Sequence, residues 1–518
     1  MCAKPNVLLI VIDCLRSDRV FDRDRTCQTP NIDALATRSI GLPNMFVENS
    51  LTAPAFASIF TGCYSLTHGV TGLLGVRLNP ELLTMADLFA ANGYHTYAEV
   101  TGPLMPLIGL NQGFDEYNYR DQRRYHSTPW GADLLERFRA RRFTEPWLTV
   151  VHFWEVHEPR HVPAEFDSPE WGATSYDRAL SGLDPFIGRL LEACGPETVV
   201  LLTGDHGERV TETTPPDTLL PYFLKKLRIE SLKDSDRTMI GEDVDIMYLR
   251  GQELNDVSQE LVRHADAPRA KIGLGRRIRL LLKLLNIGAV RLQVQRRHPG
   301  GQGVWATLRR RWEDFLFGWA VARGDSRGAQ LQLLRTTLSQ FHLQHGYHIY
   351  DYLARVPFLV AGLPGFAAPR REEAAVKNID ILPTLGEALG LDLPSVSFHG
   401  ESFVPVLRDG RGSERPTYME TRGGAQAVHA FYIRGIRTAD YKLAYAPYDS
   451  KAPSELYDLL HDPAELHNII AGREHIAQHL REDAECLAEA MRAANPATAL
   501  SVEEQSAMIE RLKSLGYM

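Results

Sequence analysis

The chain has 518 residues, of which 44% are hydrophobic, and a formal net charge of −8, so it can form one large α/β domain with smaller units. Its six cysteines show no CxxC pairing or disulfide-framework spacing, which favours a reducing compartment. No stretch approaches the roughly 18 apolar residues of a membrane span. The apolar run near the N-terminus stops at Asp13 and lacks a cleavage site, so a strand is expected there and not a signal peptide. We expect a soluble, cytoplasmic protein.

Strand-like and helix-like segments alternate over residues 1–208. The predicted strands are 6–12, 95–100, 147–153 and 198–203, and the predicted helices are Asn31–Arg38, Leu82–Asn92 and Tyr176–Cys194. Such alternation is typical of a parallel sheet with helices on both faces. The strand pattern returns at Val356–Gly362 and is followed by a predicted helix over Ile379–Leu389.

Two of these predicted strands end on acidic residues. Val7–Ile12 runs into Asp13, and Val199–Gly204 runs into Asp205 and His206. Continuous apolar runs are typical of buried parallel strands, and ligands of open α/β sheets bind at the carboxyl ends of such strands. We therefore expect the three polar side chains to converge there. Two carboxylates and an imidazole suit one divalent cation, namely Mn²⁺, Mg²⁺ or Ca²⁺.

Thr52 opens a segment, Thr52–Gly62, whose pattern predicts a turn leading into a helix, with Pro54 in the first helical turn. A hydroxyl in that place lies near free N–H groups that can hold an anionic group. A bound metal ion would lower its pKa and make it a nucleophile. The alternative is that Thr52 only caps the helix, which cap preferences favour when this segment is considered alone.

Residues 209–344 lack strand patterns and are strongly charged, which predicts an inserted helical subdomain. Between Ala267 and Trp312 the chain has twelve lysines or arginines and no acidic residue. Within this basic run, 269–311, the segment Arg276–Arg297 mixes that charge with leucine and isoleucine. It fits a helix docked on its own domain with the arginines in water, or a peripheral contact with an anionic membrane surface. Aromatic residues are sparse there, so no nucleic acid is expected as a partner.

Beyond residue 410 the chain predicts a small C-terminal unit. Strand-like Val428–Ile433 and Tyr441–Ala446 precede a helical tail. The predicted domains are an α/β catalytic domain over 1–208 and 345–410, the basic helical insert over 209–344, and an α+β subdomain over 411–518.

Short motifs in a fixed order cover nearly all of the chain outside the insert. They are Pro5–Asp18, Thr29–Ala36, Thr52–Gly62, His68–Val70, Gly93–Thr96, Gly113–Asp115, His157–Pro159, Thr203–Glu208, His345–Asp351, Arg355–Pro357, Asp380–Thr384, Glu455–Asp458, Asp462–Asn468 and Leu515–Tyr517. Each motif alone is weak, but the ordered set resembles the sulfatase-like branch of the alkaline phosphatase superfamily. The resemblance implies an alkaline-phosphatase-like α/β sandwich with a large, mainly parallel central sheet.

The resemblance also implies roles for single residues. Asp13, Asp205 and His206 would bind the cation, and Thr52 would complete its coordination. His157 and His345 would contact the transferred group and protonate the leaving oxygen, because a histidine pKa lies near 7. The alternatives are a loop histidine held by Pro159 and a surface histidine after a long insert. Further residues that could support the site are Thr101, His161, Tyr350 and Asp351.

The chain departs from the pattern of sulfatases proper at three positions. Those enzymes have a cysteine or serine that becomes formylglycine, with an arginine four residues later; here the residues are Thr52 and Phe56. Cys14 replaces the usual second acidic ligand, and it is either a soft ligand beside a hard cation or a buried structural cysteine. Threonine cannot give the aldehyde, so the site resembles the threonine-nucleophile phosphodiesterases and transferases of the superfamily.

The leading prediction is therefore a metal-dependent hydrolase that cleaves a phosphate mono- or diester through a covalent phosphothreonine at Thr52. The substrate would be a small-molecule, lipid or glycan ester. Alternatives are a sulfatase that acts without formylglycine, a transferase that passes the phospho group to an alcohol, and a non-catalytic binding protein on this fold. The retained Asp13, Thr52, Asp205, His206 and His345 argue against the last.

Overall fold

The computed structural model describes residues 4–73, 77–210, 345–394, 398–412, 415–422, 432–493 and 501–515. By its internal contacts the chain divides into two units, one formed by Met1–Phe223 with Gln344–Met518 and the other by Leu224–Leu343. All described residues belong to the first unit. Apart from residues 209 and 210, the predicted insert 209–344 lies outside the described residues. Its basic run 269–311 and the membrane option therefore stay predictions, as does the cytoplasmic location.

Nine strands of the described chain form one sheet, in the order β4-β3-β5-β1-β6-β7-β2-β8, with β9 paired to β2. Their bounds are β1 Val7–Ile12, β2 Ser39–Phe46, β3 His95–Val100, β4 Glu116–Tyr119, β5 Trp147–Phe153, β6 Val199–Gly204, β7 Arg355–Ala361, β8 Arg370–Arg371 and β9 Val376–Lys377. Only β7 runs antiparallel to its neighbours, β6 and β2. The predicted large, mainly parallel sheet is confirmed.

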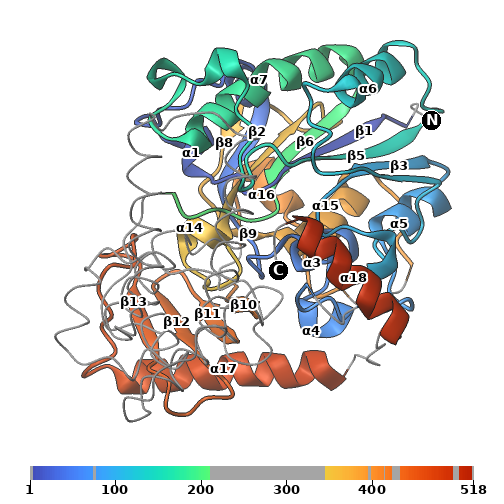
Figure 1. Ribbon diagram of the computed structural model, residues 1–518. Coiled ribbons are helices and arrows are strands. Elements are labelled where there is room, and N and C mark those ends of the chain that lie inside the picture. Colours follow the sequence, from blue (N-terminus) through green and yellow to red (C-terminus); the bar gives the residue numbers. More distant parts are fainter. Residues whose placement is uncertain are drawn as a thin grey trace, which may run out of the picture. The chain divides into compact units, whose positions relative to one another are not determined.

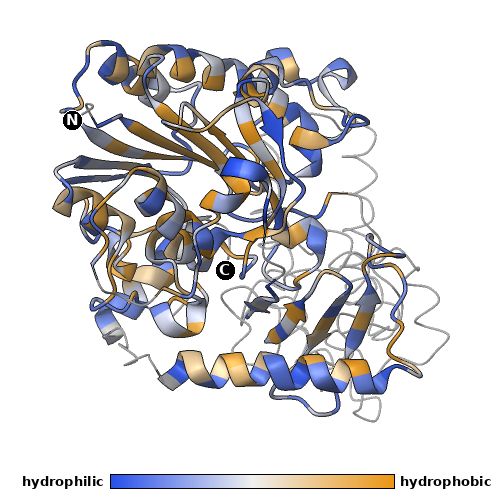
Figure 2. Ribbon diagram, turned by 180° about the vertical axis from the view of Figure 1, so that it is seen from behind, coloured by the Kyte–Doolittle hydropathy of each residue, from blue (hydrophilic) through white to orange (hydrophobic). Residues whose placement is uncertain are grey.

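Strand β1 lies in the middle of the large sheet. Every one of its residues is fully buried, as expected for a strand covered on both faces. It pairs in parallel with β5 on one side and β6 on the other. Ile12 is in register with Phe153 and with Gly204, so the residues that follow these strands leave the sheet side by side. Figure 2 shows the apolar residues concentrated on these central strands.

Helices cover both faces of the sheet (Figure 1). Helices α2 (Pro30–Ala36), α6 (Pro129–Arg139) and α7 (Ser175–Cys194) pack on one face. Helices α3 (Thr52–Thr61), α5 (Met85–Ala91) and α15 (Ile381–Ala388) pack on the other. Shorter helices are α1 Asp18–Phe21, α4 Ser65–His68, α14 Asp351–Ala354 and α16 Val404–Asp409, and the 3₁₀ turns are η1 Pro106–Ile108, η2 Ala164–Phe166, η3 Pro169–Trp171 and η5 Asn378–Asp380.

A second, antiparallel sheet follows toward the C-terminus. Its strands are β10 Thr417–Thr421, β11 Ile433–Arg437, β12 Tyr441–Tyr445 and β13 Glu455–Asp458. Helix α17 (Glu474–Ala493) packs on β11 and β12 through Ala477, Leu480 and Ala484. Helix α18 (Val502–Leu515) adds the buried Met508 to the core of the large sheet. In the described parts of the chain, no helix has the length and apolarity needed to cross a membrane.

One strand prediction needs correction, and one long strand of the large sheet was not predicted. Of the predicted strand 428–433, Ile433 alone forms a strand in the described part of the chain, and β11 continues from there to Arg437. Strand β2 was missed because Gly41, Pro43 and Asn44 interrupt its apolar pattern. The register of β2 against β7 shifts between Leu42 and Met45, which lets the strand accommodate these residues.

Candidate active site

Asp13 and Asp205 lie side by side at the ends of β1 and β6, and both are fully buried. Asp205 Oδ1 accepts hydrogen bonds from the backbone N–H groups of Cys14 (3.1 Å) and His206 (2.9 Å). Within the part of the chain that the structure describes, Asp205 Oδ2 has no hydrogen-bond partner, although it lies 3.3 Å from His206 Nε2. A buried carboxylate oxygen without a donor is costly unless a cation binds it.

The charges of the two carboxylates are strongly coupled. Burial and then the charge of Asp13 raise the pKa of Asp205. Burial also acts to raise the pKa of Asp13, but a hydrogen bond from His152 and the charges of nearby histidines hold that pKa well below its usual range. Two carboxylates in one buried site repel each other, and a divalent cation between them would remove that repulsion.

His206 is oriented to present one ring nitrogen to the carboxylates. Its Nδ1 lies 2.9 Å from the carbonyl oxygen of Gly207, to which it donates, so Nε2 is left as an acceptor. One ligand atom from each of Asp13, Asp205 and His206 lies within 4.8 Å of the others. That spacing matches ligands held 2.0–2.6 Å from a common ion, as in oxygen-rich magnesium and calcium sites. These residues therefore fit the cation that the sequence predicts.

Thr52 is the first residue of α3, and Leu51 is its N-cap. No side-chain cap bond is made there, so the alternative that Thr52 merely caps the helix is wrong. The Thr52 hydroxyl instead lies 3.3 Å from Asp13 Oδ2, to which it donates, and 3.1 Å from His206 Nε2. The structure thus places a buried hydroxyl against the carboxylates and imidazole of the candidate cation site.

The structure also brings His345 and His157 to this site. The His345 ring stacks on His206 with centroids 4.2 Å apart and meets His157 edge to face at 4.9 Å. His345 Nδ1 lies 3.1 Å from Glu208 Oε2. Burial acts to lower the His345 pKa, but the Glu208 charge and hydrogen bond raise it above its usual value. Burial lowers the His157 pKa to about 3, so His157 is neutral at pH 7.

His152 is a site residue that sequence reasoning missed. It lies in β5 opposite Val11 of β1, and its Nε2 lies 3.1 Å from Asp13 Oδ2. Its ring meets Phe56 edge to face, with centroids 4.9 Å apart. An ionisable side chain in the run 147–153, whose other residues are apolar except Thr149, was the signal that could have identified it. Phe56, which stands where sulfatases proper have arginine, therefore packs against a histidine that holds Asp13.

The sequence suggested four further residues that could support the site. Their contacts described here are with groups other than Asp13, Asp205, His206 and Thr52. Asp351 is bound by Lys442 (2.7 Å) and Arg437 (3.2 Å), so it links α14 to the C-terminal sheet. The remaining contacts are Thr101 Oγ1 to the Arg120 carbonyl at 2.9 Å, the His161 ring stacked on Tyr125 at 4.0 Å, and the Tyr350 ring stacked on His348 at 3.6 Å.

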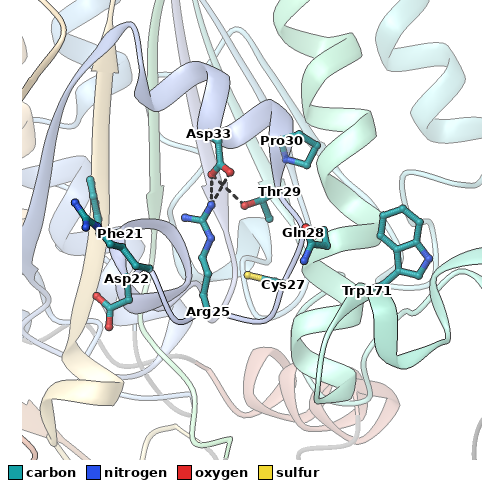
Figure 3. A pocket seen from close by; sticks show the side chains of 10 residues that line it. Phe21, Asp22, Arg25, Cys27, Gln28, Thr29, Pro30, Asp33 and Trp171 are labelled. Carbon is teal, nitrogen blue, oxygen red and sulfur yellow. Dashed lines mark hydrogen bonds and ion pairs between the residues drawn. The ribbon is translucent and has the colours of Figure 1, made fainter.

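The structure also contains a cavity that is separate from the candidate active site. Its volume is about 530 Å³, and it is lined by residues of the segment 21–33 and by Trp171. Figure 3 shows Arg25 in the cavity wall, where it pairs with Asp33. None of the candidate catalytic or cation-binding residues lines it.

The fold and this site define an ester hydrolase with the architecture of the alkaline phosphatase superfamily. The model of the Sulfatase family matches residues 5–274, and that of "N-sulphoglucosamine sulphohydrolase, C-terminal" matches residues 343–490. The first match alone spans over half of the chain. The chain therefore belongs to the sulfatase family.

Curated relatives support the same family. The chain is 35% identical over 261 residues to an ulvan-active sulfatase of Formosa agariphila, a match covering 40% of this chain and 51% of that protein. It is 22% identical to an N-acetylglucosamine-6-O-sulfatase of Bacteroides thetaiotaomicron, covering 90% and 82%. It is 29% identical to arylsulfatase K of Canis lupus familiaris, covering 90% and 79%. The chain thus spans about half the length of the first relative and most of the other two.

Solved structures share the fold at low identity. Ps i-CgsB in complex with k-i-k-neocarrahexaose has a TM-score of 0.58 and 14% identity, with 99% of each chain covered. The phosphonate monoester hydrolase of Agrobacterium radiobacter has a TM-score of 0.55 and 16% identity, with 96% of this chain and 97% of that chain covered. The predicted superfamily and the ester hydrolase are thus confirmed, whereas the sulfatase names favour the sulfate alternative over the phosphoester preference.

Proposed function

We propose that this protein hydrolyses sulfate esters with Thr52 as the nucleophile and without formylglycine. The observation that carries the proposal is the position of the Thr52 hydroxyl, 3.1 Å from His206 Nε2 and 3.3 Å from Asp13 Oδ2. Family membership supports the reaction type, and the buried carboxylate–imidazole cluster supports Thr52 as the reacting group.

Asp13, Asp205 and His206 would hold one divalent cation, with Thr52 Oγ1 as a further ligand. When bound, such a cation lowers the pKa of a coordinated hydroxyl and draws charge from the ester oxygen. The oxygen-rich ligand set favours Mn²⁺, Mg²⁺ or Ca²⁺. His152 would keep the Asp13 carboxylate in place through its 3.1 Å hydrogen bond.

The alkoxide of Thr52 would attack the sulfur of the ester, so that an O–S bond forms as the bond from sulfur to the leaving oxygen breaks. His345 is the proton donor, because Glu208 holds its Nδ1 and favours the protonated ring. Its Nε2 would pass a proton to the leaving alcohol. Water would then attack the sulfothreonine and return a proton to His345, releasing hydrogen sulfate and the alkoxide of Thr52. The neutral His157 would contact the transferred group.

Phosphoester cleavage is a second candidate, and the identity of Thr52 favours it. Threonine has one hydroxyl, so release requires attack of water on the covalent ester. Such an attack suits a phosphothreonine, and an alcohol in place of water would make the enzyme a transferase.

For the substrate, we propose a saccharide sulfate. Two of the relatives are named as an ulvan-active sulfatase and an N-acetylglucosamine-6-O-sulfatase, and the latter match covers 90% of this chain. The specificity for a particular saccharide would come from groups around the leaving oxygen, which differ between such enzymes.

The test compares hydrolysis of N-acetylglucosamine 6-sulfate, an aryl sulfate, and phosphate mono- and diesters by the full-length protein with Mn²⁺, Mg²⁺ or Ca²⁺. We expect sulfate release at the highest kcat/KM, and loss of that activity in Thr52→Ala. A higher kcat/KM for a phosphoester would favour the second candidate. Unchanged activity of Thr52→Ala on every ester would overturn Thr52 as the nucleophile.

A further inference from the structure

The loop 345–350, which carries His345, is held by two hydroxyl groups from distant segments. The Gly346 N–H donates to Ser50 Oγ at 3.1 Å, and the Ser50 hydroxyl donates to the His348 carbonyl at 2.8 Å. The Thr421 hydroxyl donates to the Gly346 carbonyl at 2.6 Å. Both polar main-chain groups of Gly346 are therefore bound by side chains, and its N–H belongs to the peptide that joins it to His345. We call Ser50 and Thr421 the clamp.

The clamp and the loop are buried and closely packed. Ser50 is 1% exposed and Thr421 is fully buried, so bulk water does not compete for these hydrogen bonds. Gly346 has a φ of 88°, and a Cβ atom there would lie 2.4 Å from Leu51 Cδ2. Glycine is thus required at this position, where the loop lies directly against the segment that follows Ser50.

The strand order explains why Ser50 meets the loop. Strand β7 lies between β6 and β2 and runs antiparallel to both. The ends of β6 and β2 therefore lie beside the beginning of β7. Glu208 follows β6, Ser50 follows β2 and His345 precedes β7, so all three residues come to the same edge of the sheet.

A second set of contacts ties the C-terminal sheet to the segment that carries Ser50. The Glu420 N–H donates to the Glu48 carbonyl at 2.8 Å, and Ser65 Oγ lies 2.9 Å from a carboxylate oxygen of each of these glutamates. Thr421 directly follows Glu420, and Ser50 stands two residues after Glu48. The two members of the clamp are therefore fixed to each other through short stretches of main chain.

The ring and the main chain of His345 are fixed by different groups. Glu208 Oε2 lies 3.1 Å from its Nδ1, and the His206 ring stacks on it at 4.2 Å, so these contacts set the direction of the ring. The clamp sets the position of the main chain from which the ring extends. A proton donor works only within hydrogen-bond reach of its target, and a misplacement of about 1 Å can lower a rate by about 100-fold.

We propose that Ser50 and Thr421 are positioning residues for His345, which keep its Nε2 within reach of the leaving oxygen. Both act through the main chain of the loop, so neither is a catalytic residue. This role rests on the proposed function, because it takes His345 as the proton donor. It gives the C-terminal sheet a part in proton transfer, since Thr421 is the last residue of β10. Ser50 also stands two residues before Thr52, so one segment positions the nucleophile and the proton donor.

The test compares two esters whose leaving groups depend on a proton donor to different extents. A 4-nitrophenyl ester leaves as a stabilised phenolate, whereas an alkyl ester such as N-acetylglucosamine 6-sulfate leaves as an alcohol that needs the proton. Both esters carry sulfate or both carry phosphate, whichever the wild type cleaves faster. In full-length Ser50→Ala and Thr421→Val, kcat for the alkyl ester should fall about 10–100-fold with little change in KM. For the nitrophenyl ester, the fall in kcat should be less than about 3-fold.

Two further variants are matched controls. Ser39→Ala and Thr198→Val also remove a buried hydroxyl that donates to a main-chain carbonyl, at 2.7 Å in both cases. Ser39 begins β2 and Thr198 directly precedes β6, so both lie at the opposite edge of the sheet from His345. Their kcat values should match those of the wild type on both esters. Thr421→Ser, which keeps the hydroxyl, should recover most of the turnover of the alkyl ester.

Hydrogen exchange at the Gly346 amide gives a reading that needs no substrate. Mass spectrometry of peptides that cover 345–350 should show faster exchange in Ser50→Ala and wild-type exchange in Ser39→Ala. Unchanged exchange in Ser50→Ala would overturn the proposal. Equal falls in kcat on the two esters would overturn it as well, because a merely structural defect does not depend on the leaving group.

The outcome for the clamp is separate from the outcome for the nucleophile. Loss of turnover in Thr52→Ala, together with equal falls on both esters in Ser50→Ala, would overturn the clamp and leave the nucleophile in place. Full activity of Thr52→Ala, together with a selective loss on the alkyl ester in Ser50→Ala, would support the clamp and overturn Thr52 as the nucleophile.

Discussion

His345 Nδ1 lies 3.1 Å from Glu208 Oε2, although 137 positions separate the two residues in the chain. Both side chains are buried, and the His345 ring stacks on His206 with centroids 4.2 Å apart. Glu208 and His345 stand directly before and directly after the segment 209–344, and they meet at the candidate active site. The pair therefore joins, at the candidate active site, the two residues that flank the segment 209–344 in the sequence.

The first prediction concerns the nucleophile. Thr52→Ala should lower kcat by on the order of 10⁴-fold or more, because the variant lacks the atom that forms the covalent intermediate. The thermal midpoint should move by less than about 4 °C, since Thr52 makes no cap bond. Thr52→Ser, which keeps a hydroxyl, should retain measurable turnover. Peptide mass spectrometry of the wild type should show an unmodified threonine at position 52, and a formylglycine mass there would refute the proposed chemistry.

The second prediction concerns pH and the stability of the metal-free protein. The His345 pKa is raised in the folded state, so its stabilisation is fully present below about pH 6.5 and is lost as pH rises through the raised pKa. The Glu208 pKa is lowered to about 2, so its stabilisation is present above about 4.5 and is lost as pH falls toward 2. The contribution of this pair to the free energy of unfolding, measured by urea denaturation across this pH range, should therefore be largest near pH 5–6.

Glu208→Gln serves as the comparison for that pH profile. The neutral amide cannot raise the His345 pKa, so the fall in stability above about pH 6.5 should flatten in the variant. Identical pH dependence in the wild type and Glu208→Gln would show that the ion pair contributes nothing to folding.

A third prediction uses the repulsion between the two carboxylates. Burial and the charge of Asp13 raise the Asp205 pKa, so Asp205→Asn should raise the thermal midpoint of the chelator-treated protein. The same substitution should abolish the increase in thermal midpoint that we expect Mn²⁺ or Ca²⁺ to produce in the wild type. At a metal concentration of 100 times Kd, binding stabilises the wild type by about 2.7 kcal/mol. A metal-dependent shift of equal size in the variant would remove Asp205 from the ligand set.

His152 gives the fourth prediction. Its Nε2 lies 3.1 Å from Asp13 Oδ2, so His152→Ala should leave that carboxylate without its partner. Removal of such a partner typically weakens metal affinity by about 10–100-fold. Calorimetric titration with Mn²⁺ would measure the change, with His399→Ala as the control, because His399 contacts Tyr64 outside the site. Equal affinities in the two variants would assign His152 a packing role against Phe56.

The sequence by itself determined the centre of the fold and the main site residues. Continuous apolar runs mark β1 and β6 because a strand buried on both faces has no polar positions. The acidic residue at the end of each run then falls at the carboxyl edge of a parallel sheet, which is a local pattern with a predictable location. Asp13, Asp205 and His206 could be identified in this way. Thr52 came from the predicted start of a helix, and the ordered motifs added His157 and His345.

Only the tertiary structure decided what surrounds these residues. The His152–Asp13 bond depends on the pairing of β5 with β1, which no spacing within either strand encodes. The left-handed turn at Cys14, whose φ is 63°, depends on Asp205 and Tyr176, which lie 191 and 162 residues away. Strand patterns report which face of an element is buried, because burial follows from local periodicity. They do not report which strands become neighbours, and it is that long-range pairing that brings Ser50, Glu208 and His345 to one edge of the sheet.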